Sequence, residues 1–280
     1  MTFDIPNKDG FWMFTSPNTW QTWVKPNQYN NFMIYVCGGG GGGRGGAGLA
    51  SGAFYGGPGG AGGQFLTINA PSFLLPENLY INIGLGGAGG TSGGGYGSAG
   101  GTSYLCYYPN TNAANVIAPA SGGAASALNS PNGGVIAAAF TNQTIFSITS
   151  SQSAGANAIT GGTGNFSSTA CCIYGGASGG GRDASNVYYD GGAQIGSNIH
   201  PTLFGSLANN SGVNGGDGYF IKKPFTALGG AGSGSSSTTP GRGGNGIFGS
   251  GGGGGGISAA GGGTNRGGRG GDGFIIIIGY

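Results

Sequence analysis

The stretch "IYVCGGGGGGRGGAG", residues 34–48, joins a short apolar segment directly to a run of glycine. Such a run could be a flexible linker, a phosphate-binding loop, or an ordered structure built by the glycines themselves. The 280 residues contain 73 glycines, but only 6% of the residues are charged and 11% are aromatic. Disordered glycine-rich chains are polar or charged and lack apolar anchors. This composition therefore predicts an ordered protein.

An ordered glycine run has no side chains to bury, so it must be stabilised by pairing its backbone N–H and C=O groups. An extended left-handed helix of the polyproline II type has three residues per turn and no internal hydrogen bonds. Its backbone groups point sideways and can bond to neighbouring helices. Residues 241–273 would reach about 100 Å if straight at that rise, whereas a compact domain of this length is about 50 Å across. The glycine runs are therefore expected to fold back on one another.

The rest of the pattern predicts an all-β fold with little helix, in which short strands bound packed polyglycine-II-type left-handed helices and long ordered loops. No strict Gly-X-Y period is present, which excludes collagen, and no long segment has the apolar spacing of a helix. The apolar segments at 31–36 and 274–280 lie at either end of the glycine-rich part and are expected to meet.

Changes in composition divide the chain into four parts. Residues 1–37 form an aromatic β segment, and residues 38–106 are the first part of a glycine-rich domain. In that part, "QFLTINAPSFLLPENLYINIGL" predicts a β-hairpin turning at "LPEN". Residues 107–213 are an insert rich in Ser, Thr and Asn, of β structure or loops. Residues 214–280 close the glycine-rich domain with a terminal strand.

No catalytic, cofactor-binding or metal-binding motif is found, and no enzyme activity is expected. A glycine-rich nucleotide loop needs a helix after it, and none is predicted after residue 48. His200 is the only histidine. Asp183 and Asp190 are a candidate pair of carboxylates for hydrolysis, but the neighbouring Arg182 favours an ordinary ion pair.

The four cysteines fit no zinc spacing and are expected to be free, buried thiols. The "GRGG" and "NRGGRGG" segments imitate RNA-binding boxes. They are too few for that function and are expected to cap the glycine runs instead.

A repeated phrase occurs as "NGGDGYF" at 214–220 and "RGGDGF" at 269–274. Its aspartates, Asp217 and Asp272, are expected to bond backbone amides where glycine meets strand. A calcium-binding β-helix is the alternative, but it would need many more tandem copies. Residues expected to close the structure are Trp20, Trp23, Asp217, Asp272 and Phe274.

Exposed loops on a rigid scaffold often carry recognition, and Tyr, Asn, Ser and Gly make adaptable contacts. The candidate receptor-contact residues are Phe54, Tyr55, Tyr107, Tyr108, Asn110, Tyr188 and Tyr189. The alternative is that the tyrosines among them pack over the glycine helices.

Four segments in sequence carry a family resemblance: "NTWQTWVKPNQYNNFMIYVCGGGGGG", "LLPENLYINIGLGGAGG", "SAGGTSYLCY" and "GGDGFIIIIGY". Together they resemble the glycine-rich domain of phage tail and virion proteins, and are similar to the polyglycine-helix adhesins at tail-fibre tips. The resemblance implies a virion component, assembled in the host cytoplasm, that contributes to host-surface attachment.

The partners that this resemblance implies are other virion proteins and a host cell-surface glycan or protein, in a homo-oligomer (a trimer) or a larger assembly. The net charge of +2 shows no basic face for nucleic acid, and no apolar run is long enough to span a membrane. Two alternatives remain open: an ice-binding protein with a polyglycine-helix face, and a glycine-rich extracellular matrix or wall protein.

Overall fold

The structure of the chain is a computed structural model. It describes residues 10–46, 55–126, 147–151, 155, 166–167, 173–185, 187–192, 194–195, 214–221, 226–258 and 265–280. The regular elements in these ranges are β-strands and two short 3-10 turns. The prediction of an all-β fold with little helix is confirmed.

One antiparallel sheet contains five strands in the order β1-β13-β3-β4-β8. Its strands are β1 (Phe11–Phe14), β13 (Phe274–Gly279), β3 (Asn31–Cys37), β4 (Phe65–Pro71) and β8 (Ser147–Ser151). A second antiparallel sheet contains four strands in the order β2-β5-β6-β7. Its strands are β2 (Gln21–Val24), β5 (Asn78–Asn82), β6 (Ser103–Cys106) and β7 (Val116–Ala120).

The smaller elements are two short strand pairs and the two turns. The strand pairs are β9 (Phe166–Ser167) with β10 (Gln194–Ile195), and β11 (Phe220–Ile221) with β12 (Thr226–Ala227). The 3-10 turns are η1 (Ser72–Leu74) and η2 (Ala113–Asn115).

The two large sheets share one apolar core, so they form a sandwich. The alternating burial of β3 places Phe32, Ile34 and Val36 in this core, which also contains Leu79 and Ile81 of β5. Trp23 of β2 is also in the core and makes an edge-to-face contact with Phe32, with ring centroids 5.2 Å apart. Both inner faces therefore follow the two-residue period of a half-buried strand.

Strand β13 is buried on both faces, which explains its continuous apolar run. Ile275 and Ile277 belong to the sandwich core, while Phe274 and Ile276 belong to a second cluster on the opposite face of the sheet. The partly buried Phe248 packs against that second cluster. A strand covered on both sides reads as an unbroken apolar segment rather than an alternating one.

The apolar segments at the two ends of the glycine-rich part do meet, as expected. Strands β3 and β13 are antiparallel neighbours, with Val36 opposite Ile275 and Cys37 opposite Phe274. The chain therefore enters its glycine-rich part and leaves it at adjacent points of one sheet.

The predicted hairpin between β4 and β5 is wrong. The two strands lie in different sheets, because β4 pairs with β3 and β8 while β5 pairs with β2 and β6. The connection crosses the end of the sandwich through η1. Pro71 and Pro76 lie on either side of this turn and lack the N–H groups that a hairpin ladder would use. Both strands also have an apolar face to bury, and the sandwich buries the two faces against each other.

The described parts of the Ser/Thr/Asn-rich region 107–213 are joined to the rest of the fold. Strand β7 pairs with β6, and β8 pairs with β4. Residues 121–126 and 173–181 bond to glycine segments on either side.

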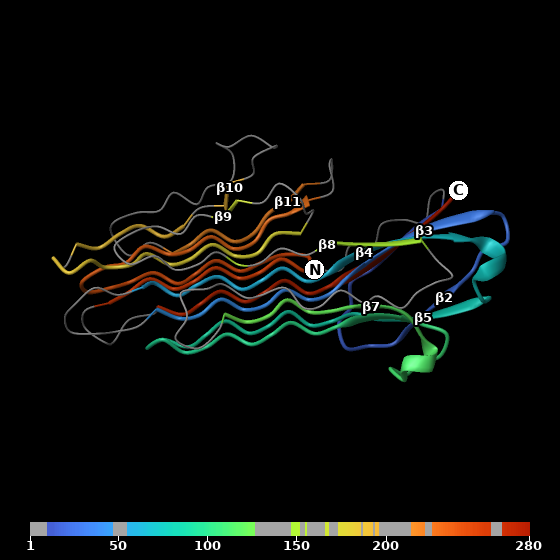
Figure 1. The fold of residues 1–280 in the computed structure, drawn as a ribbon, viewed down its shortest axis with the longest axis horizontal. Coiled ribbons are helices and arrows are strands. Elements are labelled where there is room, and N and C mark those ends of the chain that lie inside the picture. The colour runs from blue at the N-terminus through green and yellow to red at the C-terminus, as the bar shows by residue number, and fades with distance from the viewer. Residues whose placement is uncertain are drawn as a thin grey trace.

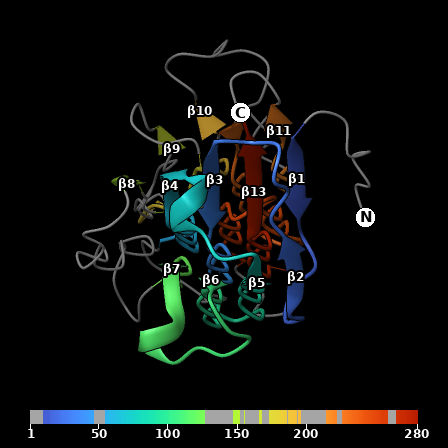
Figure 2. The ribbon, with the colours of Figure 1, turned by 90° about the vertical axis from the view of Figure 1, so that its right-hand side faces the viewer.

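The glycine segments lie side by side and form a bundle that extends from the sandwich. Figure 1 shows them running along the long axis of the molecule, with the sheets at one end. Figure 2 looks at that end of the molecule, where the same segments are seen behind the strands as coils. We call this part the glycine bundle.

Segment 38–46 donates its N–H groups in strict rotation to three neighbours. Residues 38, 41 and 44 donate to residues 64, 61 and 58, at 2.8–3.0 Å. The next residues in turn (39, 42 and 45) donate to 101, 98 and 95, and the third set (40, 43 and 46) donates to 271, 268 and 265. A period of three residues is the period of a polyproline-II-type helix.

Three further segments donate N–H groups to segment 38–46, which therefore has six neighbours. The donors are Gly87, Gly90 and Gly94 from the first of them, Gly123 from the second, and Gly252 and Gly255 from the third. The opening glycine run is thus the centre of a hexagonal arrangement. Its backbone bonds are made between segments, which is the only way such a helix can satisfy them.

Candidate functional site

The outer segments of the glycine bundle are joined by a recurring side-chain contact. Gly215 donates its N–H to the carbonyl oxygen of Arg242 (2.8 Å), while Oδ1 of the preceding Asn214 accepts the N–H of the same Arg242 (2.8 Å). An Asn-Gly pair thus holds both backbone groups of one residue on the next segment. We call this arrangement an Asx-Gly clamp.

Two more clamps follow the same rule. Asp217 and Gly218 hold Asn245, with distances of 2.7 Å to the Oδ1 of Asp217 and 2.6 Å to the carbonyl oxygen of Asn245. Asn245 and Gly246 in turn hold Arg269, at 3.0 and 2.7 Å. In each clamp a side-chain oxygen accepts a backbone N–H, whereas in the central segment 38–46 the carbonyl oxygen of a neighbouring segment does so.

A variant of the clamp joins the last glycine segment to an antiparallel neighbour. Asp272 Oδ1 accepts the N–H of Gly86 at 2.8 Å, and Gly273 donates to the carbonyl oxygen of Gly84 at 2.9 Å. The same Oδ1 is paired with Nη2 of Arg269. Asp217 and Asp272 therefore both bond a backbone amide, the type of contact that the sequence analysis expects for them.

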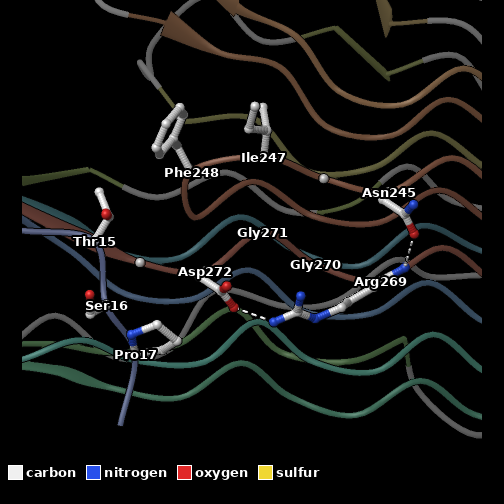
Figure 3. Close-up of a pocket in the computed structure, with 12 residues that line it drawn as sticks. Thr15, Ser16, Pro17, Asn245, Ile247, Phe248, Arg269, Gly270, Gly271 and Asp272 are labelled. Carbon is white, nitrogen blue, oxygen red and sulfur yellow. Dashed lines mark hydrogen bonds and ion pairs between the residues drawn. The ribbon is translucent and has the colours of Figure 1, made fainter. Parts of the chain in front are cut away.

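A hollow of about 500 Å³ lies where the clamped edge of the bundle meets the sandwich. Thr15, Ser16 and Pro17 form one side, and the other residues come from segments 245–248 and 269–273. Figure 3 shows Arg269 and Asp272 paired across its floor, with Asn245 beside them and the side chains of Ile247 and Phe248 at the upper edge.

The upper edge of the hollow is fixed by a tight turn. Phe248 has a φ of 45° and Gly249 a φ of 78°, and Ser250 donates its N–H to Ile247 at 3.0 Å. A bulky residue at positive φ is strained. The ring of Phe248 holds it there by edge-to-face contacts with Phe220 and Phe274, at centroid distances of 4.9 and 6.1 Å.

The candidate receptor-contact residues do not form one surface. Tyr55 is 50% exposed and begins the segment that leads through the bundle toward β4, so it lies at the end far from the sandwich. Tyr108 is 62% exposed and lies in the connection from β6 to β7, at the opposite end of the molecule. Its neighbour Tyr107 packs against the sandwich core. Asn110 is occupied by the turn, because its Oδ1 accepts the N–H of Asn112 and a proton from Asn115 Nδ2.

Tyr188 and Tyr189 lie in a local loop with Arg182 and Asp183. Arg182 Nη1 donates to the hydroxyl of Tyr188 (3.3 Å), and Tyr189 donates its hydroxyl proton to Asp183 Oδ2 (3.1 Å). That bond, followed by burial and the charge of Asp183, raises the pKa of Tyr189. Phe54 and His200 lie outside the described residues, as do Cys171 and Cys172.

Of the residues expected to close the structure, Trp23 and Phe274 are buried in the two apolar clusters. Trp20 is half-buried just before β2. Cys37 and Cys106 are buried thiols that form no disulfide, as predicted. Burial raises the pKa of the Cys106 thiol to about 11.

Within the described ranges, no group of three or more His, Cys, Asp or Glu side chains could hold a metal ion. The same part of the chain contains no helix of the length and hydrophobicity needed to cross a membrane.

The hollow was not predicted from the sequence, although one of its residues, Asp272, is among those expected to close the structure. Asn245, Arg269, Thr15 and Ser16 come from three distant segments. One signal was available: "RGGNGIF" at 242–248 is a third copy of the repeated phrase, with Asn245 where the other copies have Asp217 and Asp272.

Comparison with protein families gives one match. The sequence profile described as the glycine-rich domain matches residues 15–280, which is nearly the whole chain. No curated protein matches the sequence.

Proposed function

This chain belongs to the glycine-rich domain family, and from this premise we propose that it is a structural protein of a phage virion. In this proposal it is a tail-fibre, spike or capsid-associated component that contributes to attachment at the host surface. Its role is non-enzymatic. Its partners are other virion proteins, in a homo-oligomer or larger assembly, together with a glycan or protein of the host surface.

The observation that carries the proposal is the construction of the glycine bundle. Segment 38–46 has hydrogen-bonded neighbours on six sides, and the bundle continues directly into a sandwich with an apolar core. A rigid and elongated body of this kind is suited to holding a binding surface away from a particle. Helix–helix bonds through the backbone also need no cofactor or metal to be stable.

The composition of the surface supports a role in attachment. Exposed tyrosines occur at both ends of the molecule, including Tyr55, Tyr108 and Tyr280. Tyrosine provides a large contact area with little loss of side-chain entropy. One end could therefore contact the particle while the other faces outward.

The test is the composition and labelling of purified particles. Mass spectrometry of virions from the virus that encodes this chain should detect it at a fixed stoichiometry, and immunogold labelling should place it on the tail or capsid. Its absence from such particles would contradict the proposal. A purified monomer that produces thermal hysteresis would support the ice-binding alternative instead.

A further inference from the structure

We propose that the hollow between residues 15–17 and the clamped edge of the bundle binds a neutral sugar residue. The hollow is about 500 Å³, within the range of small-molecule sites. This inference names the ligand class of the host contact and rests on the proposed function. It adds a contact on the flank of the molecule to those of the exposed tyrosines at its ends.

The first argument is that two polar side chains in the hollow, Asn245 and Asp272, each have one atom bonded to a backbone amide of the bundle. Asn245 Oδ1 accepts the backbone N–H of Arg269, and Asp272 Oδ1 accepts the backbone N–H of Gly86. The partner atoms of the same groups, Nδ2 of Asn245 and Oδ2 of Asp272, have no protein hydrogen bond among the described residues. A donor and an acceptor are thus held in place for a ligand.

The second argument is that this pair of atoms matches the hydroxyl groups of a sugar. Each sugar hydroxyl both donates and accepts, so neighbouring hydroxyls can donate to a carboxylate oxygen and accept from an amide. Thr15 and Ser16 add hydroxyl groups on the facing side of the hollow. Because the Asn and Asp side chains are already ordered by the clamps, binding costs little further side-chain entropy.

The third argument concerns charge. Arg269 and Asp272 form an ion pair whose side chains are 47% and 32% exposed. Their charges offset each other, so the floor of the hollow has no net charge to select an anion or a cation. Phe248 adds an apolar edge, and its ring is held by its contacts with Phe220 and Phe274. Polar groups at the floor and an apolar edge suit a neutral sugar ring, which has hydroxyl groups at its rim and C–H groups on its faces.

The experiment measures sugar binding by the purified full chain. Methyl glycosides of glucose, galactose, mannose, rhamnose and N-acetylglucosamine are tested by saturation-transfer NMR and titration calorimetry. Glucuronic acid and N-acetylneuraminic acid are tested in parallel. This assay needs no virion, so its result is independent of the particle composition that tests the proposed function.

The decisive variants keep the clamps but change the atoms that face the ligand. Asn245→Asp retains an oxygen for the Arg269 N–H and replaces the free donor by an acceptor. Asp272→Asn retains an oxygen for the Gly86 N–H and replaces the free acceptor by a donor. Asp217→Asn is the matched control, since Asp217 itself does not line the hollow and the asparagine keeps an oxygen for the Asn245 N–H. The pair Thr15→Val and Ser16→Ala tests the other side of the hollow without touching the bundle.

The expected result is binding of at least one neutral glycoside. Affinity should fall at least tenfold in Asn245→Asp and in Asp272→Asn, fall less in the Thr15→Val, Ser16→Ala variant, and stay unchanged in Asp217→Asn. Melting temperatures identify any variant that does not fold. The proposal is overturned if no neutral glycoside binds, if only the acidic sugars bind, or if the folded hollow variants bind as well as the parent chain.

Discussion

Gly41 lies so close to Ala124 that a Cβ atom on Gly41 would be 2.2 Å from the carbonyl oxygen of Ala124. The N–H of Gly41 at the same time bonds the carbonyl oxygen of Ala61 at 2.8 Å. Side chains are therefore excluded from the centre of the bundle by the same neighbours that satisfy its backbone.

Replacing Gly41 by alanine should destabilise the protein by at least about 3 kcal/mol, at the upper end of the usual cost of overpacking. The neighbouring backbone cannot move aside, because it is bonded on its other faces. The control is Gly93→Asn: Gly93 has a φ of 78° and open space around it, and Asn tolerates that conformation. Its cost should stay within about 1 kcal/mol. Denaturant unfolding measures both, and equal costs would contradict the packing described.

Removing one Asx-Gly clamp should have a small, local effect. Asp217→Ala deletes the acceptor for the Asn245 N–H, at a cost of about 1 kcal/mol, the usual contribution of one hydrogen bond. Hydrogen exchange at the Asn245 amide should become faster. Asp217→Asn keeps an acceptor oxygen and should leave this amide protected. Unchanged exchange in the alanine variant would show that the clamp does not hold the segment.

Lys25 should contribute more to the stability of the fold than its ion pair with the exposed Glu77 suggests. Its Nζ donates to the carbonyl oxygens of Ser72 and Leu75 at 3.1 and 2.9 Å and pairs with Glu77 at 3.3 Å. The Lys25 side chain is only 9% exposed, whereas that of Glu77 is 70% exposed.

Lys25→Met leaves two carbonyl groups of the η1 connection without their donor and should cost about 1–3 kcal/mol. Glu77→Gln removes only an exposed charge and should cost less than about 1 kcal/mol. Thermal unfolding of the two variants checks this order; a larger loss in Glu77→Gln would reverse the assignment.

Alkaline pH should destabilise the protein through Cys106. Burial raises the pKa of this thiol from 9.0 to about 11, so the folded state favours the neutral form. A raised folded pKa gives stability that is complete below pH 9 and is lost as the pH rises toward 11. In Cys106→Ala the free energy of unfolding should fall less steeply over this window. Parallel pH profiles for the two proteins would contradict the prediction.

The sequence was sufficient to predict that the glycine segments are ordered and that the strands on either side of the glycine-rich part pair with each other. Abundant glycine with few charges indicated an ordered backbone-bonded structure, and the apolar runs around Val36 and Ile275 predicted strands that meet. The wrong prediction of a hairpin between β4 and β5, whose connection contains Pro71 and Pro76, has a physical origin. A hairpin and a crossing between sheets use the same strand–turn–strand pattern, and only the tertiary packing of Leu66 and Ile81 selects the crossing.

The hollow could not be predicted for a different reason. Its polar residues, such as Asn245 and Asp272, are ordinary turn residues in sequence, and their role depends on which segments are neighbours in the bundle. Neighbours in a bundle bonded by backbone groups are not specified by side-chain patterns. The three copies of the repeated phrase indicate a shared contact, but the register that places Asn245 against Arg269 appears only in three dimensions.

The position of β13 has a consequence for how the protein is made. This strand lies between β1 and β3, and segment 265–271 accepts hydrogen bonds from the central segment 38–46. Both are synthesised after nearly all of their partners. The N–H groups of Gly40, Gly43 and Gly46 therefore lack their partners until residues 265–271 have been synthesised. Folding that depends on such distant contacts is slow, so biogenesis of this protein should depend on protection of the nascent chain.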